Sequence, residues 1–395
     1  MPRRGLMVHN ALVMALYRVM KEHMNRAGHT AVTAAVLLVG IASIADAGCE
    51  GCNVSGASQS PAVLPVSPNP GGEWLHTEHN RILTSDGKPF HGRGANIQDT
   101  RSCDACSYET PHPAEVKRRI DELVDNWKAN FLRLTLESYA TADRRDTWKS
   151  ATDDDPYLRD LVDIVHQVEQ KPGVYVEISV WHDASLDSMG WPTDKTRVLW
   201  EKLVHTFAGS PRVLFGVANE PEQNQDGAMD AYAWDAMNRT VETIRTAEGA
   251  GPHHIVAVQG TRMWARRLDY YVSHPITAGG GVDVAYETHA YDPRAKLDAL
   301  VDGPAKTLPV IIGEFGPVED QHLAHMTLDD CAYLMRRAEE REIPYLAWTF
   351  HMRCPPNLLV DTSGGKCGVA MPLQPTPWGS LLKNRLAQPY GTKAE

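Results

Sequence analysis

Eight short apolar segments recur along the chain after residue 90, and most of them are followed by a stretch with helical periodicity. The expected strands are His91–Ile97, Asn130–Leu136, Val174–Trp181, Val213–Asn219, His254–Gly260, Val282–Ala290, Pro309–Glu314 and Tyr345–Phe350. The expected helices are Pro113–Lys128, Pro156–Gln170, Lys195–Phe207, Ala228–Glu248 and Leu328–Glu342, with Trp378–Leu386 as a closing helix. This alternation predicts an α/β fold in which eight parallel strands close into a (β/α)8 TIM barrel.

An open, doubly wound sheet is the alternative arrangement of the same elements. Such sheets often bind nucleotides through a glycine-rich turn after a strand, and neither a dinucleotide nor a P-loop fingerprint follows any of the eight segments. The barrel is therefore favoured over the open sheet.

Two local patterns complete the predicted fold. Trp74–Phe90 is expected to form a short N-terminal β-hairpin that turns at Ser85-Asp86-Gly87, because Asp-Gly supplies the positive φ of a tight turn. The acidic run Asp153–Asp155 precedes Pro156, and an N-cap followed by proline is typical of a helix start. A helix start is therefore favoured over a calcium site at this run.

The amino-terminal segment has the pattern of a signal peptide. Ala31–Ala45 is apolar or small and uncharged, Lys21 and Arg26 precede it, and Ala45-Asp46-Ala47 fits a cleavage site. The stretch is shorter than the about 20 apolar residues that cross a bilayer, so no transmembrane span is expected. We expect a signal peptide over 1–47 with its true start at Met1 or Met24, a Ser/Pro/Gly-rich linker over 48–72, and the barrel domain over 73–390.

The seven cysteines leave several possibilities open. Cys354 and Cys367 bracket a loop rich in Pro and Gly and are the favoured disulfide pair, because export places the chain in an oxidising compartment. Zinc binding by the two Cys-x-x-Cys pairs, which begin at Cys49 and Cys103, is disfavoured because the pairs are far apart. Cys49 lies just after the expected cleavage site, so a lipid anchor on Cys49 is the alternative to full secretion.

The net charge of the chain is −11, and its first 47 residues are basic, so the remainder is more acidic than the whole. An acidic surface repels phosphate backbones and anionic lipid headgroups. Nucleic acid is therefore not expected as a partner, whereas a neutral substrate is compatible with this charge.

Polar or aromatic residues occupy the ends of six of the apolar strands. A buried strand accommodates a charge where it reaches the barrel mouth, which is also where the active sites of such barrels lie. One residue of this kind is commonly structural, whereas six strands that share the feature indicate a site. The positions are Arg133, Trp181-His182-Asp183, Asn219-Glu220-Pro221, His289-Ala290-Tyr291, Gly313-Glu314-Phe315-Gly316 and Trp348.

Two of these residues are glutamates that end the fourth and seventh expected strands, Glu220 and Glu314. Glycoside hydrolysis requires such a pair, with one protonated acid for the leaving oxygen and one carboxylate beneath the anomeric carbon. Their carboxyl groups are expected to converge to about 5 Å, the spacing of retaining enzymes.

These motifs resemble glycoside hydrolase family 5, a cellulase-type family of the retaining clan A, from about Trp74 to the last helix. In that family the glutamate of the Asn-Glu-Pro motif is the general acid/base, which assigns this role to Glu220 and places Asn219 at the sugar 2-hydroxyl. The glutamate that ends the seventh strand is the nucleophile, here Glu314. The arginine of the second strand, here Arg133, orients the nucleophile and is expected to lower its pKa.

The resemblance also implies which residues hold the sugar, and it implies neither a metal nor another cofactor. Those residues are Tyr291, which would hydrogen-bond the nucleophile, His182 and His289 beside the −1 sugar, Trp348 as its floor, and Trp264 in a loop where many members place a stacking aromatic.

Other residues near these motifs are open to two interpretations, as part of the substrate cleft or as structural residues. Arg262, Arg266 and Arg267 are unusual for a cleft that binds a neutral glycan, and surface ion pairs are their favoured explanation. Trp191 and Tyr139 are either sugar platforms or packing residues.

Together these features predict a retaining endo-β-1,4-glucanase that acts as a monomer, is secreted or held at the cell envelope, and cleaves a β-glycan. A β-mannanase or an exo-β-glucosidase is the first alternative, because two carboxyl groups do not specify the sugar. A catalytically silent glycan-binding barrel is the second. A zinc hydrolase is weaker still, because no His-x-His spacing occurs at the strand ends.

Overall fold

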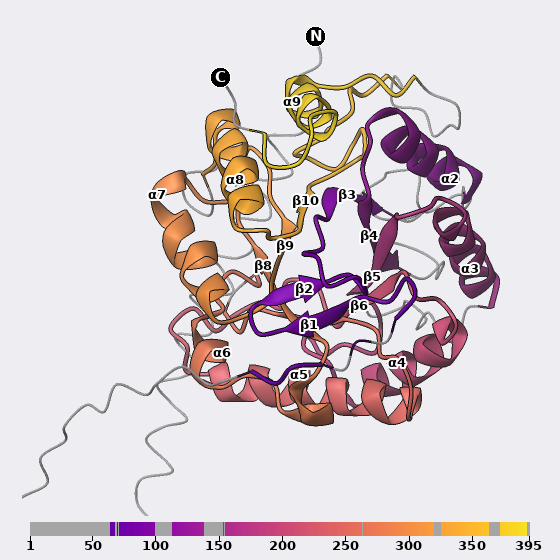
Figure 1. Cartoon of the computed structure of the whole chain (residues 1–395), viewed down its shortest axis with the longest axis vertical. Helices are drawn as coiled ribbons and strands as arrows, with labels where there is room; N and C mark the ends of the chain where they lie inside the picture. The colour runs from indigo at the N-terminus through magenta and orange to yellow at the C-terminus, as the bar shows by residue number, and fades with distance from the viewer. Residues whose placement is uncertain are drawn as a thin grey trace, which may run out of the picture. The chain divides into compact units, whose positions relative to one another are not determined.

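The computed structural model covers the whole chain, and the residues described are 64–67, 69, 71–98, 113–137, 153, 155–262, 264–319, 325–362 and 372–392. Eight parallel strands form a closed barrel in the order β10-β3-β4-β5-β6-β7-β8-β9 (Figure 1). They are β3 (Arg93–Gln98), β4 (Phe131–Glu137), β5 (Tyr175–His182), β6 (Val213–Gly216), β7 (Val256–Gln259), β8 (Val284–His289), β9 (Val310–Glu314) and β10 (Tyr345–Ala347). The predicted (β/α)8 barrel is confirmed, and each expected strand overlaps an observed one.

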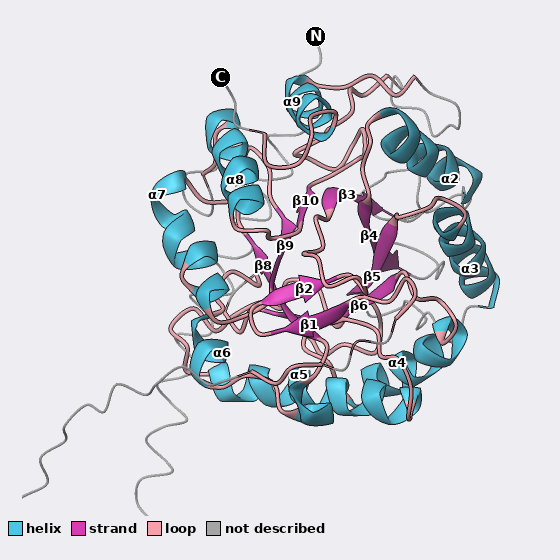
Figure 2. Ribbon diagram, viewed as in Figure 1, coloured by secondary structure: helices cyan, strands magenta, loops and turns pink. Residues whose placement is uncertain are grey.

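Helices surround the strands, and all six expected helical segments are present (Figure 2). They are α2 (Pro113–Asp121) with a π-helical turn over Glu122–Asn126, α3 (Asp155–Glu169), α4 (Asp194–Phe207), α5 (Asp230–Glu248), α8 (Leu328–Glu340) and α9 (Pro377–Leu386). Two short helices were not expected, α6 (Asp269–Ser273) and α7 (Arg294–Leu297), because segments of five and four residues are too short to show a periodic pattern.

Local sequence explains where several helices begin. Thr193 and Thr327 form capping boxes at α4 and α8, in which each threonine side chain accepts a backbone N–H of the first turn. Helix α3 begins at Asp155, so the acidic run before Pro156 does lead into a helix, as predicted.

The N-terminal hairpin is present, but its turn lies earlier than expected. Strands β1 (His76–Glu78) and β2 (Arg81–Leu83) pair antiparallel, so the chain reverses at His79 and Asn80. His79 adopts the positive φ of 54° that this tight reversal requires. The Asp86-Gly87 turn also forms, with Gly87 N–H donating to Thr84 O across 2.8 Å, but it follows β2. Two turns with a residue of positive φ thus lie close together, at His79 and at Gly87, and the first of them connects the two strands of the hairpin.

The barrel interior changes from apolar to polar along the strands. At the amino-terminal ends an apolar layer packs against the hairpin and includes Leu75, Ile82, Phe90, Phe131, Tyr175, Leu214, Ile255, Ala257, Ala285, Ile311 and Leu346. Because alternate strand residues face the same side, the next interior positions of β4, β5 and β8 hold Arg133, Glu177 and Glu287. The hairpin and the apolar layer thus close the lower end, and buried charge begins directly above them.

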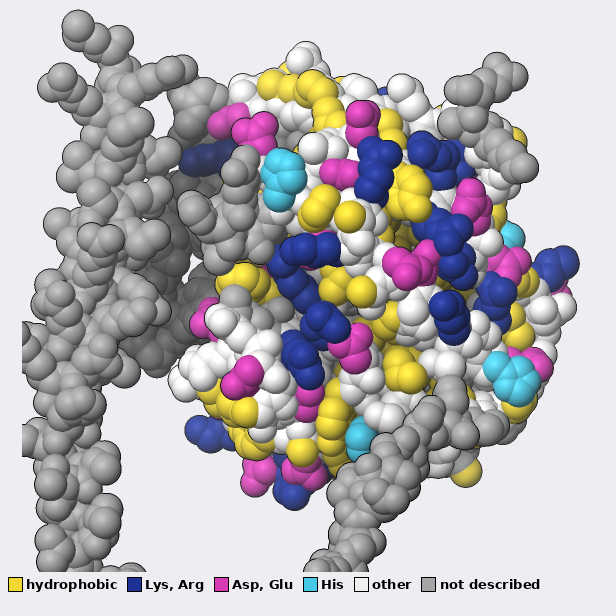
Figure 3. Space-filling model, turned by 90° about the vertical axis from the view of Figure 1, so that its left-hand side faces the viewer, with side chains coloured by type: hydrophobic (Ala, Val, Ile, Leu, Met, Phe, Trp, Pro, Cys, Tyr) yellow, Lys and Arg dark blue, Asp and Glu magenta, His cyan; other side chains and the backbone are white. Residues whose placement is uncertain are grey.

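Basic side chains on the flank formed by α7 and α8 lie next to carboxylates (Figure 3). Arg294 lies 3.0 Å from Asp330, and Arg337 lies 2.8 Å from Asp302. In each pair the aspartate is buried and the arginine reaches the surface. Their balanced charge is compatible with the neutral substrate expected from the net charge.

Several sequence predictions fall outside the described residues. These are the signal peptide, Cys49, most of the linker, Cys103, Tyr139 and Cys367. Cys354 is disulfide-bonded, and its pairing with Cys367 remains a prediction, whereas Cys331 is a buried free thiol. In the described part of the chain no helix combines the length and the apolar content that a membrane crossing requires.

Candidate active site

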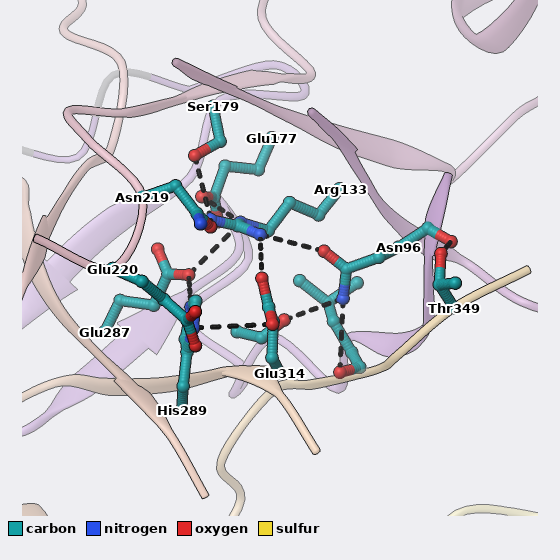
Figure 4. Close-up of polar contacts among 12 residues, drawn as sticks. Asn96, Arg133, Glu177, Ser179, Asn219, Glu220, Glu287, His289, Glu314 and Thr349 are labelled. Carbon is teal, nitrogen blue, oxygen red and sulfur yellow. Dashed lines mark hydrogen bonds and ion pairs between the residues drawn. The ribbon is translucent and has the colours of Figure 1, made fainter. Parts of the chain in front are cut away.

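The predicted polar residues meet at the carboxyl-terminal mouth of the barrel. Glu314 is the last residue of β9 and His289 the last of β8, while Asn219 and Glu220 follow β6 by three and four positions. Strand β6 is shorter than expected, because the chain leaves the ladder at Gly216 and carries Asn219 and Glu220 into the mouth. Figure 4 shows Asn219 and Glu314 beside Arg133, and Glu220 beside His289.

Glu314 is almost fully buried, with 3% of its surface exposed. Arg133 Nη1 donates to Glu314 Oε1 across 2.8 Å, and Tyr291 Oη donates to Glu314 Oε2 across 2.9 Å. Both contacts favour the ionised carboxylate. Burial and the nearby charge of Glu220 nevertheless raise the pKa of Glu314, while the charges of His289 and Arg133 lower it. Burial is the largest of these effects, and the pKa rises to about 7. Arg133 does lower this pKa, as expected, but the expectation omitted the larger cost of burying the charge, so the net shift is upward.

Glu220 is only partly buried and faces the same histidine. Its Oε1 lies 2.8 Å from His289 Nδ1, and Glu314 Oε2 lies 3.5 Å from the same nitrogen. A carboxyl oxygen of Glu220 and one of Glu314 lie within 4.8 Å of each other. Glu220 has a left-handed backbone with φ of 44°, an uncommon conformation for a residue with a side chain. The loop thus holds its carboxyl group close to that of Glu314.

Arg133 connects most of the site. Burial opposes its charge, but the surrounding carboxyl groups outweigh this and raise its pKa further, so the guanidinium stays charged. Its donors point in several fixed directions, as the planar guanidinium requires. Besides Glu314, they meet Asn96 Oδ1 at 2.9 Å, Ser179 Oγ at 2.9 Å, Asn219 Oδ1 at 2.7 Å and Glu177 Oε1 at 3.2 Å.

His289 is fully buried and lies between carboxyl groups. Its Nδ1 faces Glu220, and its Nε2 lies 2.9 Å from Glu287 Oε1. Burial opposes the imidazolium, yet the charge of Glu314 and the contacts to Glu220 and Glu287 raise its pKa to about 10. His289 is therefore an imidazolium at neutral pH and donates from both ring nitrogens.

Within the described residues, one group of side chains has the proximity of a metal site, namely Glu220, His289 and Glu314. Both ring nitrogens of His289 already meet a carboxyl oxygen, Glu220 Oε1 at 2.8 Å and Glu287 Oε1 at 2.9 Å. Hydrogen bonds therefore account for the proximity of these side chains.

Two hollows adjoin Glu220. One has a volume of about 510 Å³, and its lining includes Trp181, Asp183, Leu186, Met189, Glu222 and Trp264. The other, of about 280 Å³, contains Glu314 and includes Tyr291, Trp348, Val318, Pro355 and Pro356 in its lining. Trp181, Asn219, Glu220 and Trp264 line both, so the two hollows adjoin each other at Glu220.

The remaining sequence candidates fall into three groups. Trp264 and Trp348 line the hollows, whereas Trp191 is fully buried and is a packing residue. Backbone pairing places His182 at the end of β5, but its side chain is not among those described. Arginines 262, 266 and 267 each pair with an aspartate, in the pairs Arg262–Asp230, Arg266–Asp292 and Arg267–Asp269. The expected surface ion pair is confirmed for Arg267, whose aspartate is also exposed. Arg262 and Arg266 pair instead with buried aspartates. Arg266 also lines the hollow that contains Glu314, so the surface explanation was wrong for this residue.

Sequence reasoning missed a set of buried polar residues below the mouth, namely Asn96, Glu177, Ser179, Gln259 and Glu287. Four of them stand inside strands, and Gln259 is the last residue of β7. The alternation of strand residues could have found Glu177 and Glu287, since each lies two positions after an apolar residue of the interior layer.

A closed parallel barrel with two carboxyl groups close together at its carboxyl-terminal mouth is typical of retaining glycoside hydrolases. The family described as cellulase (glycosyl hydrolase family 5) matches residues 83–353 of this chain. The chain therefore belongs to glycoside hydrolase family 5, a retaining family of clan A.

Individual relatives match this chain at low sequence identity. The chain is 26% identical over 204 residues to endoglucanase A of Butyrivibrio fibrisolvens (51% of this chain, 44% of the relative), and 23% identical over 290 residues to endoglucanase E-5 of Thermobifida fusca (68% and 54%). It thus spans about half the length of these relatives. A β-glucanase from Saccharophagus degradans, solved in complex with cellotetraose, superposes with a TM-score of 0.59 at 20% identity (85% of this chain, 98% of that one).

Proposed function

We propose that this chain is a retaining endo-β-1,4-glucanase in which Glu314 is the nucleophile and Glu220 the general acid/base. The observation that carries the proposal is the approach of their carboxyl oxygens to within 4.8 Å at the barrel mouth. Retaining enzymes have carboxyl groups about 5 to 5.5 Å apart, whereas inverting enzymes need about 6.5 to 9.5 Å to accommodate a water.

In the first step Glu314 attacks the anomeric carbon as the glycosidic C–O bond breaks, and Glu220 gives its proton to the leaving oxygen. Negative charge thereby moves from Glu314, which becomes an ester, to Glu220. Both carboxyl groups face His289 Nδ1, at 3.5 Å and 2.8 Å. The imidazolium therefore stays close to the charge in both states, and the total charge of the cluster is unchanged.

In the second step Glu220 acts as a base. It removes a proton from water, the water oxygen bonds to the anomeric carbon, and the ester bond to Glu314 breaks. Arg133 and Tyr291 accept the returning charge on Glu314 through the hydrogen bonds already in place. The product keeps the configuration of the substrate, and the enzyme returns to its starting protonation state.

The residues around the pair suit a sugar substrate. Asn219 is oriented by its 2.7 Å bond from Arg133, which leaves its amide NH₂ available for the sugar 2-hydroxyl. Trp348 and Trp264 provide aromatic faces on which sugar rings can pack. We also assign His182 to the −1 subsite from its place at the end of β5.

Internal cleavage of a β-glucan is favoured by the two hollows that adjoin each other at Glu220, because an endo-acting enzyme binds sugars on each side of the scissile bond. The relatives named endoglucanases and the β-glucanase solved with cellotetraose support a β-1,4-glucan. A β-mannanase, an exo-β-glucosidase and a silent glycan-binding barrel are the alternatives.

The test is incubation of the purified chain with carboxymethylcellulose, barley β-glucan, glucomannan and an aryl β-glucoside, followed by measurement of product size. A rapid fall in β-glucan chain length with short oligosaccharides is expected. Faster cleavage of mannan would assign a mannanase, glucose as the sole early product would assign exo action, and binding without cleavage would leave a silent barrel.

Export is the setting that the amino-terminal sequence supports, with a signal peptide over 1–47, a linker over 48–72 and the catalytic domain over 73–390. The disulfide at Cys354 suits an oxidising compartment. Expression in a bacterial host and intact mass of the mature protein test this proposal. A terminus at Gly48 indicates secretion, an acylated Cys49 indicates a lipid anchor, and an uncleaved chain contradicts both.

We propose a monomer, which light scattering of the same sample would check.

A further inference from the structure

Two carboxyl groups that the proposed mechanism does not use lie below the site, on strands across the barrel from each other. Glu177 comes from β5 and Glu287 from β8, and both are fully buried. Arg133 Nε lies 3.2 Å from one oxygen of each. The other oxygens, Glu177 Oε2 and Glu287 Oε2, are buried and meet no donor among the described side chains (Figure 4). Buried carboxyl oxygens without a donor are rare and need an explanation.

The neighbouring strands are built to make room for these two side chains. A Cβ added at Gly216 of β6 would collide with Glu177 Oε1, and one added at Gly313 of β9 would collide with Glu287 Oε1. The interior of such barrels is usually filled with branched apolar side chains. Here two positions of that layer are glycine and two hold a carboxyl group, so the pair is a specific feature of this barrel.

The charge balance of the cluster limits how many carboxyl groups can be ionised. The titratable groups that face one another are Arg133 of β4, Glu177 of β5, Glu220 after β6, Glu287 and His289 of β8, Tyr291 after β8 and Glu314 of β9. Arg133 and His289 carry positive charge, and Tyr291 stays neutral because burial raises its pKa. Unbalanced charge in a buried site is costly. Neutrality therefore allows two of the four glutamates to be ionised.

The surroundings of the lower pair show where one proton lies. Burial and the charge of Glu287 raise the pKa of Glu177 well above its usual range, whereas Arg133 and the bond from His289 overcome burial and lower that of Glu287 to about 2. A proton on Glu177 also supplies the donor that the two unpartnered oxygens lack. Glu287 then carries one negative charge, and one remains for Glu220 and Glu314 together.

We propose that Glu177 and Glu287 form a buried acid–carboxylate pair whose single negative charge holds His289 as an imidazolium and thereby leaves one proton shared between Glu220 and Glu314. This inference rests on the proposed function for its catalytic consequence, since a retaining enzyme starts with one acid and one carboxylate. Glu177 and Glu287 touch no substrate. They are positioning residues that act through His289 and Arg133.

The two members of the pair should respond differently to replacement by glutamine. Glu177→Gln keeps a neutral side chain that can donate to Glu287, so the charge of the cluster does not change. Glu287→Gln removes a negative charge, and the cluster compensates by releasing a proton from His289 or from the Glu220–Glu314 pair. The alkaline limb of kcat/KM against pH should therefore move to lower pH by about one unit in Glu287→Gln. Both limbs should stay within about 0.3 units of wild type in Glu177→Gln.

A measurement without substrate separates this inference from the proposed function. In protein labelled with ¹⁵N-histidine, the His289 signal, assigned by its loss in His289→Gln, should show an imidazolium to above pH 8 in the wild type and in Glu177→Gln. It should lose its proton at lower pH in Glu287→Gln. Glu339→Gln is the matched control, because this buried glutamate bonds to Arg385 and Tyr345 away from the site. It should lower the melting temperature and leave both the His289 titration and the pH profile unmoved.

Equal titration of His289 in wild type and Glu287→Gln would overturn the inference, as would a shift of either limb in Glu177→Gln, which would mean that Glu177 is ionised. If Glu287→Gln does not fold, Glu177→Gln alone still decides the matter, because only a protonated Glu177 predicts an unmoved profile. A chain without glycosidase activity would contradict the proposed function, while the His289 titration would still test the pair.

Discussion

Arg133 reaches across the barrel to Glu314, and its Nη1 donates to Glu314 Oε1 over 2.8 Å although the two residues are 181 positions apart in the chain. Strands β4 and β9 are not neighbours, since β3 and β10 lie between them. The contact therefore exists only when the barrel is closed. Only the correctly folded sheet therefore places the positive charge of Arg133 beside the carboxyl group that we propose as nucleophile.

Arg133→Lys should reduce kcat by about 100-fold or more, because an ammonium cannot direct donors to Asn96, Ser179, Asn219 and Glu314 at once. The buried acceptors left without donors should also lower the melting temperature. Arg385→Lys is the matched control, since Arg385 of α9 is buried in an ion pair with Glu339 of α8. It should lower stability with kcat nearly unchanged, and an equal loss of kcat in both variants would contradict a specific role for Arg133.

Glu314→Gln should lower turnover by about 10⁴-fold or more, because it removes the nucleophile with little change in side-chain volume. Steady-state hydrolysis of β-glucan measures the loss, and calorimetry with a cello-oligosaccharide should show binding preserved. Because burial already raises the pKa of Glu314, the neutral amide should not destabilise the fold strongly. Wild-type turnover in this variant would remove Glu314 from the proposed mechanism.

Glu220→Ala should spare the first step for substrates with good leaving groups, since these need little help from an acid. Turnover of natural glucan should fall by about 10² to 10⁴-fold, and added azide should restore part of the rate by replacing base-activated water. Glu222→Ala, an exposed carboxylate two positions along, is the control and should show no azide effect. Equal losses on activated and natural substrates in Glu220→Ala would argue against an acid/base role.

The eight strands could be predicted because each is an apolar run bounded by polar or turn residues. Glu220 and Glu314 could be placed because both follow such runs directly. Glu177 was missed for the opposite reason: it lies inside an apolar run, where a carboxyl group is unexpected. Its partner Glu287 comes from a strand more than 100 residues away, and Gly216 and Gly313 make space for the pair. No local pattern contains that relationship, because it requires the facing positions of four strands.

The net pKa of Glu314 could not be foreseen either. The sequence offered Arg133 as a neighbour that favours the carboxylate, and that contact is present. The degree of burial and the approach of Glu220 depend on the closed mouth and on the left-handed backbone at Glu220. Both raise the pKa, and in a buried site the loss of solvation can exceed the gain from one ion pair.

Stability should decline as the pH rises above neutrality, and His289 should be one cause. Its pKa is about 10 in the folded protein against 6.5 for the ordinary side chain, so protonated His289 favours the folded state. This contribution is fully present below pH 6.5 and is lost as the pH rises to 10. Melting temperatures of wild type and His289→Gln between pH 6 and 10 test it. The wild-type advantage should shrink with pH, and a constant difference would contradict the linkage.

The stereochemistry of the product follows from the spacing of Glu220 and Glu314. With carboxyl oxygens within 4.8 Å of each other, no space remains for a water between the base and the anomeric carbon. The sugar must then bond to Glu314 first, and water must attack from the face that the leaving group vacated. Two inversions at one carbon restore the β configuration. Proton NMR within the first minutes of cello-oligosaccharide cleavage should therefore show the β-anomer before mutarotation, whereas an initial α-anomer would establish single displacement and contradict a nucleophilic Glu314.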